Sequence, residues 1–160
     1  MRVAFVLFVV TALIAACSSI DCPVENSVNM VYMVYNDNNE PDTLKDTLTI
    51  FTTRRDGSDS VLVNYAVDTD TFKLPVSYTD PEDTLFFLVW GEDYAALDTV
   101  YVAKEDEPHF ESVDCSMSFF HTITGVRYTT NIIEKIEIIK TAVNYDSSEE
   151  HFHIFFKDAP

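Results

Sequence analysis

The sequence predicts an all-β protein, an antiparallel β-sandwich of about nine strands with immunoglobulin-like general architecture. Three observations support this prediction. Short apolar segments recur about every ten residues, clusters of Asp, Asn, Pro and Ser that favour turns separate them, and almost no segment has helical periodicity. The apolar fraction of 47%, with 12 Phe and 8 Tyr, excludes a disordered chain despite the net charge of −17.

The expected strands are the apolar runs between turn clusters. The first, 28–35, is apolar at both alternating sets of positions, which predicts a strand covered on both faces. Pro75 removes a backbone donor, so its segment should lie at a sheet edge or strand end. The segment 84–90 is the most apolar. The expected strands are 28–35, 47–53, 61–67, 71–76, 84–90, 97–104, 110–123, 131–140 and 152–157.

The spacing of apolar residues is informative in two of these segments, 61–67 and 131–140. Val61, Val63, Tyr65 and Val67 alternate along their segment and are expected on one face of the strand. The run 131–140 also has helical spacing, but its five isoleucines are β-branched and favour a strand.

An Asp-Thr pair followed by an apolar residue recurs along the chain. Asp stabilises turns through its side chain and Thr favours extended backbone, so we expect these pairs to begin strands. The aspartates are Asp42, Asp46, Asp70, Asp83 and Asp98.

The N-terminal segment predicts export. Arg2 precedes an uncharged apolar run, 3–16, which is shorter than the roughly 20 residues of a membrane-spanning helix. Leu13-Ile14-Ala15-Ala16-Cys17 is the pattern of a lipoprotein cleavage site, with lipid on Cys17. The alternative is an ordinary signal peptide that leaves Cys17 as a free or disulfide-bonded thiol. We therefore expect a cleaved signal helix at 1–16, a lipidated tether at 17–27 and one β-sandwich domain at 28–160.

Two cysteines remain for the exported domain. Cys22 and Cys115 form an even pair in a chain that leaves the reducing cytoplasm, so we expect a disulfide bond. Two free thiols or a metal-binding pair are the alternatives. Loss of Arg2 moves the charge from −17 to −18, which argues against a nucleic-acid partner and against electrostatic attraction to anionic lipid. We expect the protein to contact the membrane through its lipid anchor.

Residues 17–160 resemble a family of small Bacteroidota lipoproteins known only as a domain of unknown function. The resemblance rests on Cys22, Leu74-Pro75, the segment 98–102, Cys115 with the five residues before it, the segments 130–132 and 136–139, and 150–156. This family usually has glycine after the second cysteine, where the chain has Ser116. The resemblance implies a β-rich envelope lipoprotein and no particular activity. Ser18 directly after Cys17, in place of an aspartate, favours the outer membrane, on either its periplasmic or its surface side.

Two histidines near the C-terminus are candidate metal ligands. His151 and His153 would lie about 7 Å apart on one face of a strand, and could share a zinc ion with His109, His121 or an acidic residue as a third ligand. The simpler interpretation is a partly solvated sheet face.

The acidic turns near Asp37, Asp56 and Asp80 could bind calcium, but solvated turns explain them equally well. The segment 37–42 lacks the glycine and the terminal glutamate of an EF-hand loop. No cofactor is assigned to the chain.

The sequence assigns no catalytic residue. Its three glycines, Gly57, Gly91 and Gly125, are far apart, which excludes glycine-rich phosphate loops and the nucleophile elbow. His109, Ser112 and Asp114 are close in sequence but have no elbow or oxyanion motif around them.

We therefore expect a lipid-anchored, non-catalytic envelope protein that binds or braces a protein or glycan. A small metal-dependent or carboxylate-based envelope hydrolase is the alternative. A pocket with converging His and carboxylate groups would favour the enzyme, and a filled core with a flat aromatic face would favour binding.

Overall fold

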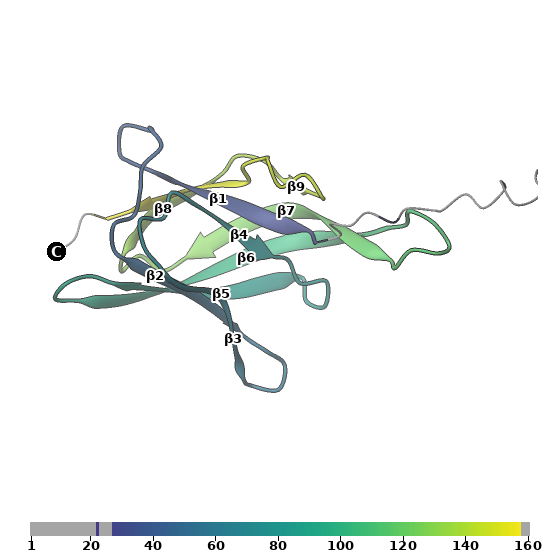
Figure 1. Cartoon of the computed structure of the whole chain (residues 1–160), viewed down its shortest axis with the longest axis horizontal. Coiled ribbons are helices and arrows are strands. Elements are labelled where there is room, and N and C mark those ends of the chain that lie inside the picture. Colours follow the sequence, from purple (N-terminus) through teal and green to yellow (C-terminus); the bar gives the residue numbers. More distant parts are fainter. Residues whose placement is uncertain (1–21, 23–26, 158–160) are drawn as a thin grey trace, which may run out of the picture.

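The computed structural model describes residue 22 and residues 27–157, which form two β-sheets packed face to face (Figure 1). One sheet has the strand order β4-β1-β10-β8, and the other has the order β3-β2-β5-β6-β7-β9. The described residues contain no helix, so the predicted all-β sandwich is confirmed. The strands are β1 (Asn29–Tyr35), β2 (Thr47–Thr53), β3 (Asp59–Ala66), β4 (Thr71–Pro75), β5 (Glu82–Trp90), β6 (Ala95–His109), β7 (Ser118–Tyr128), β8 (Ile133–Ile138), β9 (Ala142–Val143) and β10 (Phe152–Phe156).

Most of the predicted segments contain a strand. β2 has the predicted bounds, and the ambiguous run 131–140 contains β8. β4 lies at the edge of the four-stranded sheet and ends at Pro75, as the missing backbone donor predicted. The expected signal helix at 1–16 lies outside the described residues.

The described residues form ten strands, which agrees with the predicted number of about nine, and the two-residue strand β9, paired with β7, is the short one that was not predicted. The predicted antiparallel pairing is wrong at one place, since β1 and β10 pair in parallel, with Tyr32 opposite Phe152. The last strand enters between β1 and β8 and pairs antiparallel only with β8.

The predicted strand 110–123 is confirmed only from Ser118 onward. β6 and β7 form a long hairpin, and residues 110–117 are the loop between them. The apolar residues of this loop, Phe110, Val113 and Met117, are exposed, so their presence reflected no buried strand. The strand pattern instead continues to Tyr128.

The expected common face of Val61, Val63, Tyr65 and Val67 is not formed. Two register shifts in the β2–β3 pair place Val63 opposite Ile50 and Val61 opposite Phe51, on opposite faces of the sheet. Val63 packs against the core, whereas Val61 is exposed. Each β-bulge adds a residue and reverses the side-chain alternation beyond it.

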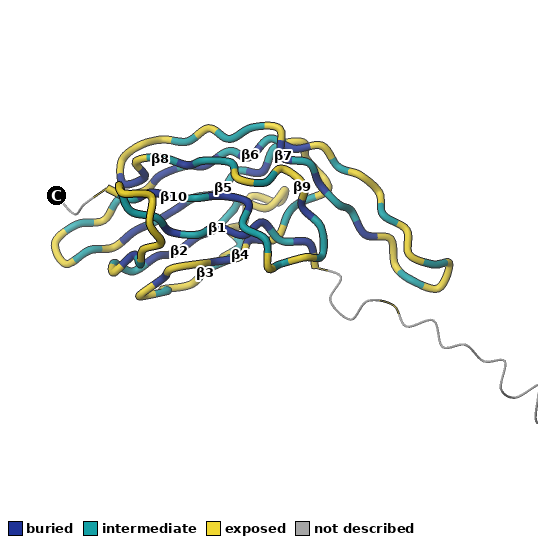
Figure 2. Tube along the Cα trace, turned by 90° about the horizontal axis from the view of Figure 1, so that it is seen from above, coloured by how far each residue is buried: buried dark blue, intermediate teal, exposed yellow. Residues whose placement is uncertain are grey.

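The core is built around an aromatic stack in the four-stranded sheet. The Tyr32 ring lies between Phe72 of β4 and Phe152 of β10, at centroid distances of 5.1 and 4.6 Å. Phe87 of the opposite sheet packs 6.1 Å from Tyr32. Tyr32 is fully buried, and its hydroxyl has no hydrogen-bond partner among the described residues. Burial, with the charge of Asp83, raises the pKa of this hydroxyl far above its ordinary value. In Figure 2 the buried residues follow the inner sides of both sheets.

A buried carboxylate connects the two sheets. Asp98 lies inside β6, fully buried, and not at the strand start that its Asp-Thr pair predicted. Its Oδ1 accepts hydrogen bonds from Thr129 and the Asn131 amide, and its Oδ2 accepts from the Ile132 and Ile133 amides at 2.8 and 2.7 Å. Burial alone would raise its pKa, but these bonds outweigh burial and lower it. Asp98 therefore fixes the segment that leads from β7 to β8.

Replacing Asp98 by Asn should lower the free energy of unfolding by about 2 to 4 kcal/mol, because an amide NH₂ group cannot accept from the backbone donors it would face. Urea unfolding followed by fluorescence measures this. Asp42→Asn, at an exposed turn of the same Asp-Thr type, should change stability by less than about 0.5 kcal/mol. Equal effects of the two substitutions would contradict this role of Asp98.

Candidate functional site

The predicted disulfide bond is present. Cys22 and Cys115 are bonded, with their Cα atoms 5.6 Å apart. Cys115 belongs to the loop between β6 and β7, so the bond joins the chain before β1 to the tip of the long hairpin. Cys17, the predicted lipidation site, lies outside the described residues.

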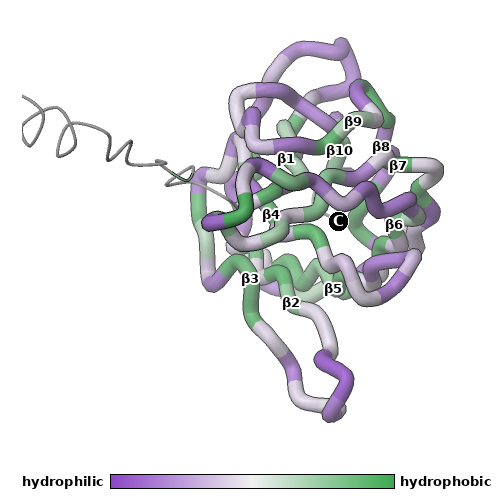
Figure 3. Tube along the Cα trace, turned by 90° about the vertical axis from the view of Figure 1, so that its right-hand side faces the viewer, coloured by the Kyte–Doolittle hydropathy of each residue, from purple (hydrophilic) through white to green (hydrophobic). Residues whose placement is uncertain are grey.

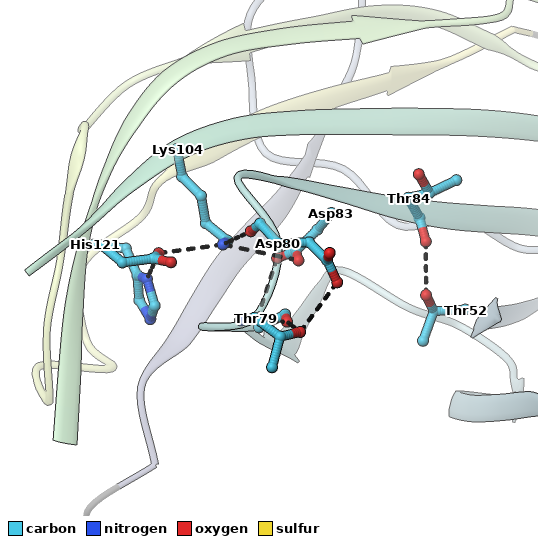
Figure 4. A network of polar contacts seen from close by, with 9 residues as sticks. Thr52, Thr79, Asp80, Asp83, Thr84, Lys104 and His121 are labelled. Carbon is cyan, nitrogen blue, oxygen red and sulfur yellow. Dashed lines mark hydrogen bonds and ion pairs between the residues drawn. The ribbon is translucent and has the colours of Figure 1, made fainter. Parts of the chain in front are cut away.

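A buried polar cluster joins the strands of this hairpin to the turn before β5 (Figure 4). The Lys104 side chain is fully buried, and its Nζ donates to the Asp80 carbonyl at 2.7 Å and to Asp106 Oδ1 at 3.2 Å. The same Asp106 oxygen bonds His121 Nδ1 at 2.7 Å, and Asp83 Oδ1 lies 4.0 Å from Lys104 Nζ. A buried charge is tolerated when it is paired and hydrogen-bonded. The Lys104 ammonium group meets this condition, and its bond to the Asp80 carbonyl connects β6 to the turn before β5.

The cluster has shifted acid–base properties. Burial raises the pKa of Asp83 to about 6, against the opposing effects of Lys104 and the Ser77 amide. Burial lowers the pKa of His121, although Asp106 opposes this change. His121 also lines a cavity of about 260 Å³ with Tyr78, Met117 and Phe119.

An aspartate that orients a histidine resembles a general base. Among the described residues, however, no Ser, Thr or Cys side chain forms a hydrogen bond with the His121 ring. The cluster therefore has the pairing of a structural ion network.

The four histidines are not brought together. His151 is fully buried; its Nδ1 accepts from the Val31 amide at 3.1 Å and its Nε2 donates to the Ala142 carbonyl at 3.2 Å. Burial lowers the pKa of His151. His153 stacks on Tyr35 and pairs with Glu150. Both ring nitrogens of His151 are engaged in hydrogen bonds, so the zinc ion considered as one possibility for His151 and His153 finds no free ligand on His151. No group of three or more metal-binding side chains occurs in the part of the chain that the structure describes.

The acidic turns use their side chains locally. Asp56 Oδ1 accepts from the Ser58 amide and hydroxyl, and Asp80 Oδ2 accepts from Thr79. In the turn that contains Asp37, the Asn36 side chain accepts from two backbone amides. His109 pairs with Glu111, and the Ser112 hydroxyl accepts from the Asp114 amide, so these residues form no triad.

The outer face of the six-stranded sheet carries apolar residues on the neighbouring strands β3, β2, β5 and β6. Alternate residues of β5 pack inward, as Leu85, Phe87 and Val89, while the others point outward. Cross-strand pairing places Val61, Phe51 and Phe86 in one row, and Leu88 beside Leu97 in the next. We call this surface the aromatic face; it comprises Phe51, Val61, Tyr65, Phe86, Leu88, Trp90, Leu97 and Tyr101.

The aromatic face is solvent-accessible and carries few charges. Tyr65 and Trp90 are 66% and 44% exposed. Phe51 and Phe86 stack at 5.0 Å. Arg127 lies over the Tyr101 ring at 3.5 Å and pairs with Glu82 at 2.7 Å, at the border of the face. Figure 3 shows hydrophobic stretches in β2, β3 and β5, and hydrophilic residues in the loop between β2 and β3. The sequence signal for this face was the strand 84–90, which is apolar at both sets of positions.

Asp83 generates a testable pH dependence. Its pKa is about 6 in the fold and about 3.9 in an unfolded chain, so the folded state binds more protons between pH 4 and 6, and stability falls as pH rises through this window. The Asp83→Asn variant has no carboxyl group at this position, so its stability does not fall for this reason as the pH rises. The unfolding free energy of the variant minus that of the parent should therefore increase by about 2 kcal/mol from pH 4 to 7.

Urea unfolding at several pH values measures this difference, and contributions from His121, His151 and Asp98 cancel in it. If the difference in unfolding free energy between variant and parent does not change from pH 4 to 7, Lys104 keeps Asp83 ionised over this whole range and the prediction is wrong.

A comparison with protein families gives one match: a family of unknown function, DUF6452, covers residues 47–156. No curated protein and no solved structure matches the chain. A search of the described residues found no helix with the length and hydrophobicity to cross a membrane.

Proposed function

The chain belongs to the family of unknown function DUF6452, and we propose that it is a lipid-anchored, non-catalytic binding protein of the bacterial cell envelope. The observation that carries the proposal is the aromatic face, a nearly uncharged surface on a chain that contains 27 Asp and Glu residues. Its lipid anchor is Cys17, and its compartment is the outer membrane. A disulfide bond in the folded domain supports an oxidising compartment.

The composition of the aromatic face supports a protein as its partner. Fully buried centres of protein interfaces are rich in aromatic residues and Arg, and poor in other charges. The face combines aromatic rings with the aliphatic Val61, Leu88 and Leu97, and Arg127 stacks at its border. A glycan would need many hydrogen-bonding groups for its hydroxyls, whereas the polar side chains between these apolar residues are mainly threonines, such as Thr49 and Thr99.

The net charge narrows the choice of protein partner. With a charge of −17, two copies of this chain would repel each other at close approach. A partner with an apolar patch and a neutral or basic rim fits better. We therefore propose an envelope protein of that kind as the occupant.

The lipid anchor can be tested directly. Mass spectrometry of the protein purified from the membranes of its own cells should find a fatty-acylated Cys17 at the N-terminus. Cys17→Ala should abolish acylation, whereas Cys22→Ala with Cys115→Ala should retain it, because these cysteines form the disulfide bond. A bare thiol at Cys17, or an uncleaved N-terminal segment, would overturn the proposed anchoring.

The binding face can be tested by photo-crosslinking in intact cells. A photoreactive amino acid at Leu97 should form one discrete adduct, and Val61→Ser with Tyr65→Ser should reduce its yield by about tenfold, because these exposed residues belong to the same face. The same probe at the exposed Glu134, on the other sheet, is the matched control.

Equal yields at Leu97 and Glu134, or a yield unaffected by the serine substitutions, would refute binding through this face. An adduct of twice the chain mass would identify a second copy as the occupant and overturn the proposed heterologous partner.

A further inference from the structure

The β6–β7 hairpin projects beyond the other strands (Figure 1). β5 pairs with β6 only as far as Ala103, whereas the pairing of β6 with β7 continues to His109 and Ser118. Beyond this last pair, the loop 110–117 exposes three apolar side chains. Phe110, Val113 and Met117 are 61%, 85% and 59% exposed. Figure 2 shows the tip of the hairpin as an exposed region.

The disulfide bond fixes how far this loop can lie from Cys17. Cys22 is five positions after Cys17, and an extended chain spans at most about 3.6 Å per position, or about 18 Å in all. The Cα atoms of Cys22 and Cys115 are 5.6 Å apart. The Cα atom of Cys115, in this loop, therefore stays within about 24 Å of the Cα atom of Cys17.

We propose that the hairpin tip is a membrane-contact element, in which Phe110, Val113 and Met117 enter the interfacial layer of the bilayer beside the lipid anchor. This inference rests on the proposed lipidation of Cys17. The anchor makes contact with the bilayer effectively intramolecular, so a small apolar surface is sufficient for it. A single apolar loop would bind only weakly without this anchor.

The charge of the tip specifies the kind of lipid surface. Residues 105–117 contain no Lys or Arg. They include the acidic residues Glu105, Asp106, Glu107, Glu111 and Asp114. An anionic surface would repel this segment, so the tip fits zwitterionic headgroups such as phosphatidylcholine or phosphatidylethanolamine.

Membrane contact at the tip also orients the aromatic face. Trp90 pairs with Ala95, at the end of β6 opposite the tip. His109 is fourteen positions after Ala95, which corresponds to about 46 Å along the strand. The tip would therefore lie in the interface while Trp90 is held away from the membrane.

Fluorescence quenching by lipid tests this inference. The chain 17–160 retains every described residue and has one free thiol, Cys17, when the disulfide bond is intact. This thiol is coupled to a maleimide lipid in phosphatidylcholine liposomes that contain brominated acyl chains. Because Trp90 is the single native tryptophan, Trp90→Phe with Phe110→Trp places the fluorophore at the tip alone.

We expect the quenched fraction at the tip to be at least about threefold larger than that of Trp90 in the parent chain, which is the matched control. Adding Val113→Ser and Met117→Ser should return tip quenching to the level of the control. Exchanging part of the lipid for anionic phosphatidylglycerol should also weaken it.

Tip quenching equal to that of Trp90, or quenching that survives the two serine substitutions, would overturn the inference. Burial of the tip only in native membranes that contain other proteins would also overturn it, in favour of a protein partner. Because the lipid is attached chemically, these results are independent of whether cells acylate Cys17.

Discussion

The stack of Phe72, Tyr32 and Phe152 holds the four-stranded sheet together. These rings come from β4, β1 and β10, segments far apart in the sequence, and each contact lies between directly paired residues. Aromatic pairs across strands stabilise a sheet beyond the area that they bury. Phe87 packs against Tyr32 and Phe72 from the opposite sheet, so the same cluster joins both layers. Tyr32 and Phe152 are also the first pair of the parallel ladder between β1 and β10.

Strand positions could be predicted from the sequence because they depend on local patterns. Apolar alternation, turn clusters and Pro75 are visible along the chain, and they located most strands and one sheet edge. Pairing direction was not visible, since the neighbour of β1 is contributed by residues 120 positions away. The register shifts on either side of Ile50 were not visible either. They place Val61 and Val63, which were predicted on one face, on opposite faces of the sheet. The pattern of 110–117 resembles a strand, but tertiary context makes it a loop.

The polar sites were harder to predict, because their partners meet only in the fold. Asp98 had the sequence environment of a turn aspartate, yet it binds backbone amides 33 to 35 residues away. Lys104 and His121 converge on Asp106 across two strands of the hairpin. The Cys22–Cys115 pairing was predictable because the chain has three cysteines and Cys17 was predicted to carry lipid, which leaves Cys22 and Cys115 as each other's only partner. The aromatic face lay hidden in an apolar strand whose outward residues could equally have been covered by another layer.

The disulfide bond decides where mechanical load enters the domain. Tension on the chain before Cys22 passes through the sulfur atoms to Cys115, and reaches the hairpin before it reaches β1. The pull then acts at the end of β6 and β7 that carries the loop 110–117. A reductant would move the point of loading from the hairpin to the first strand.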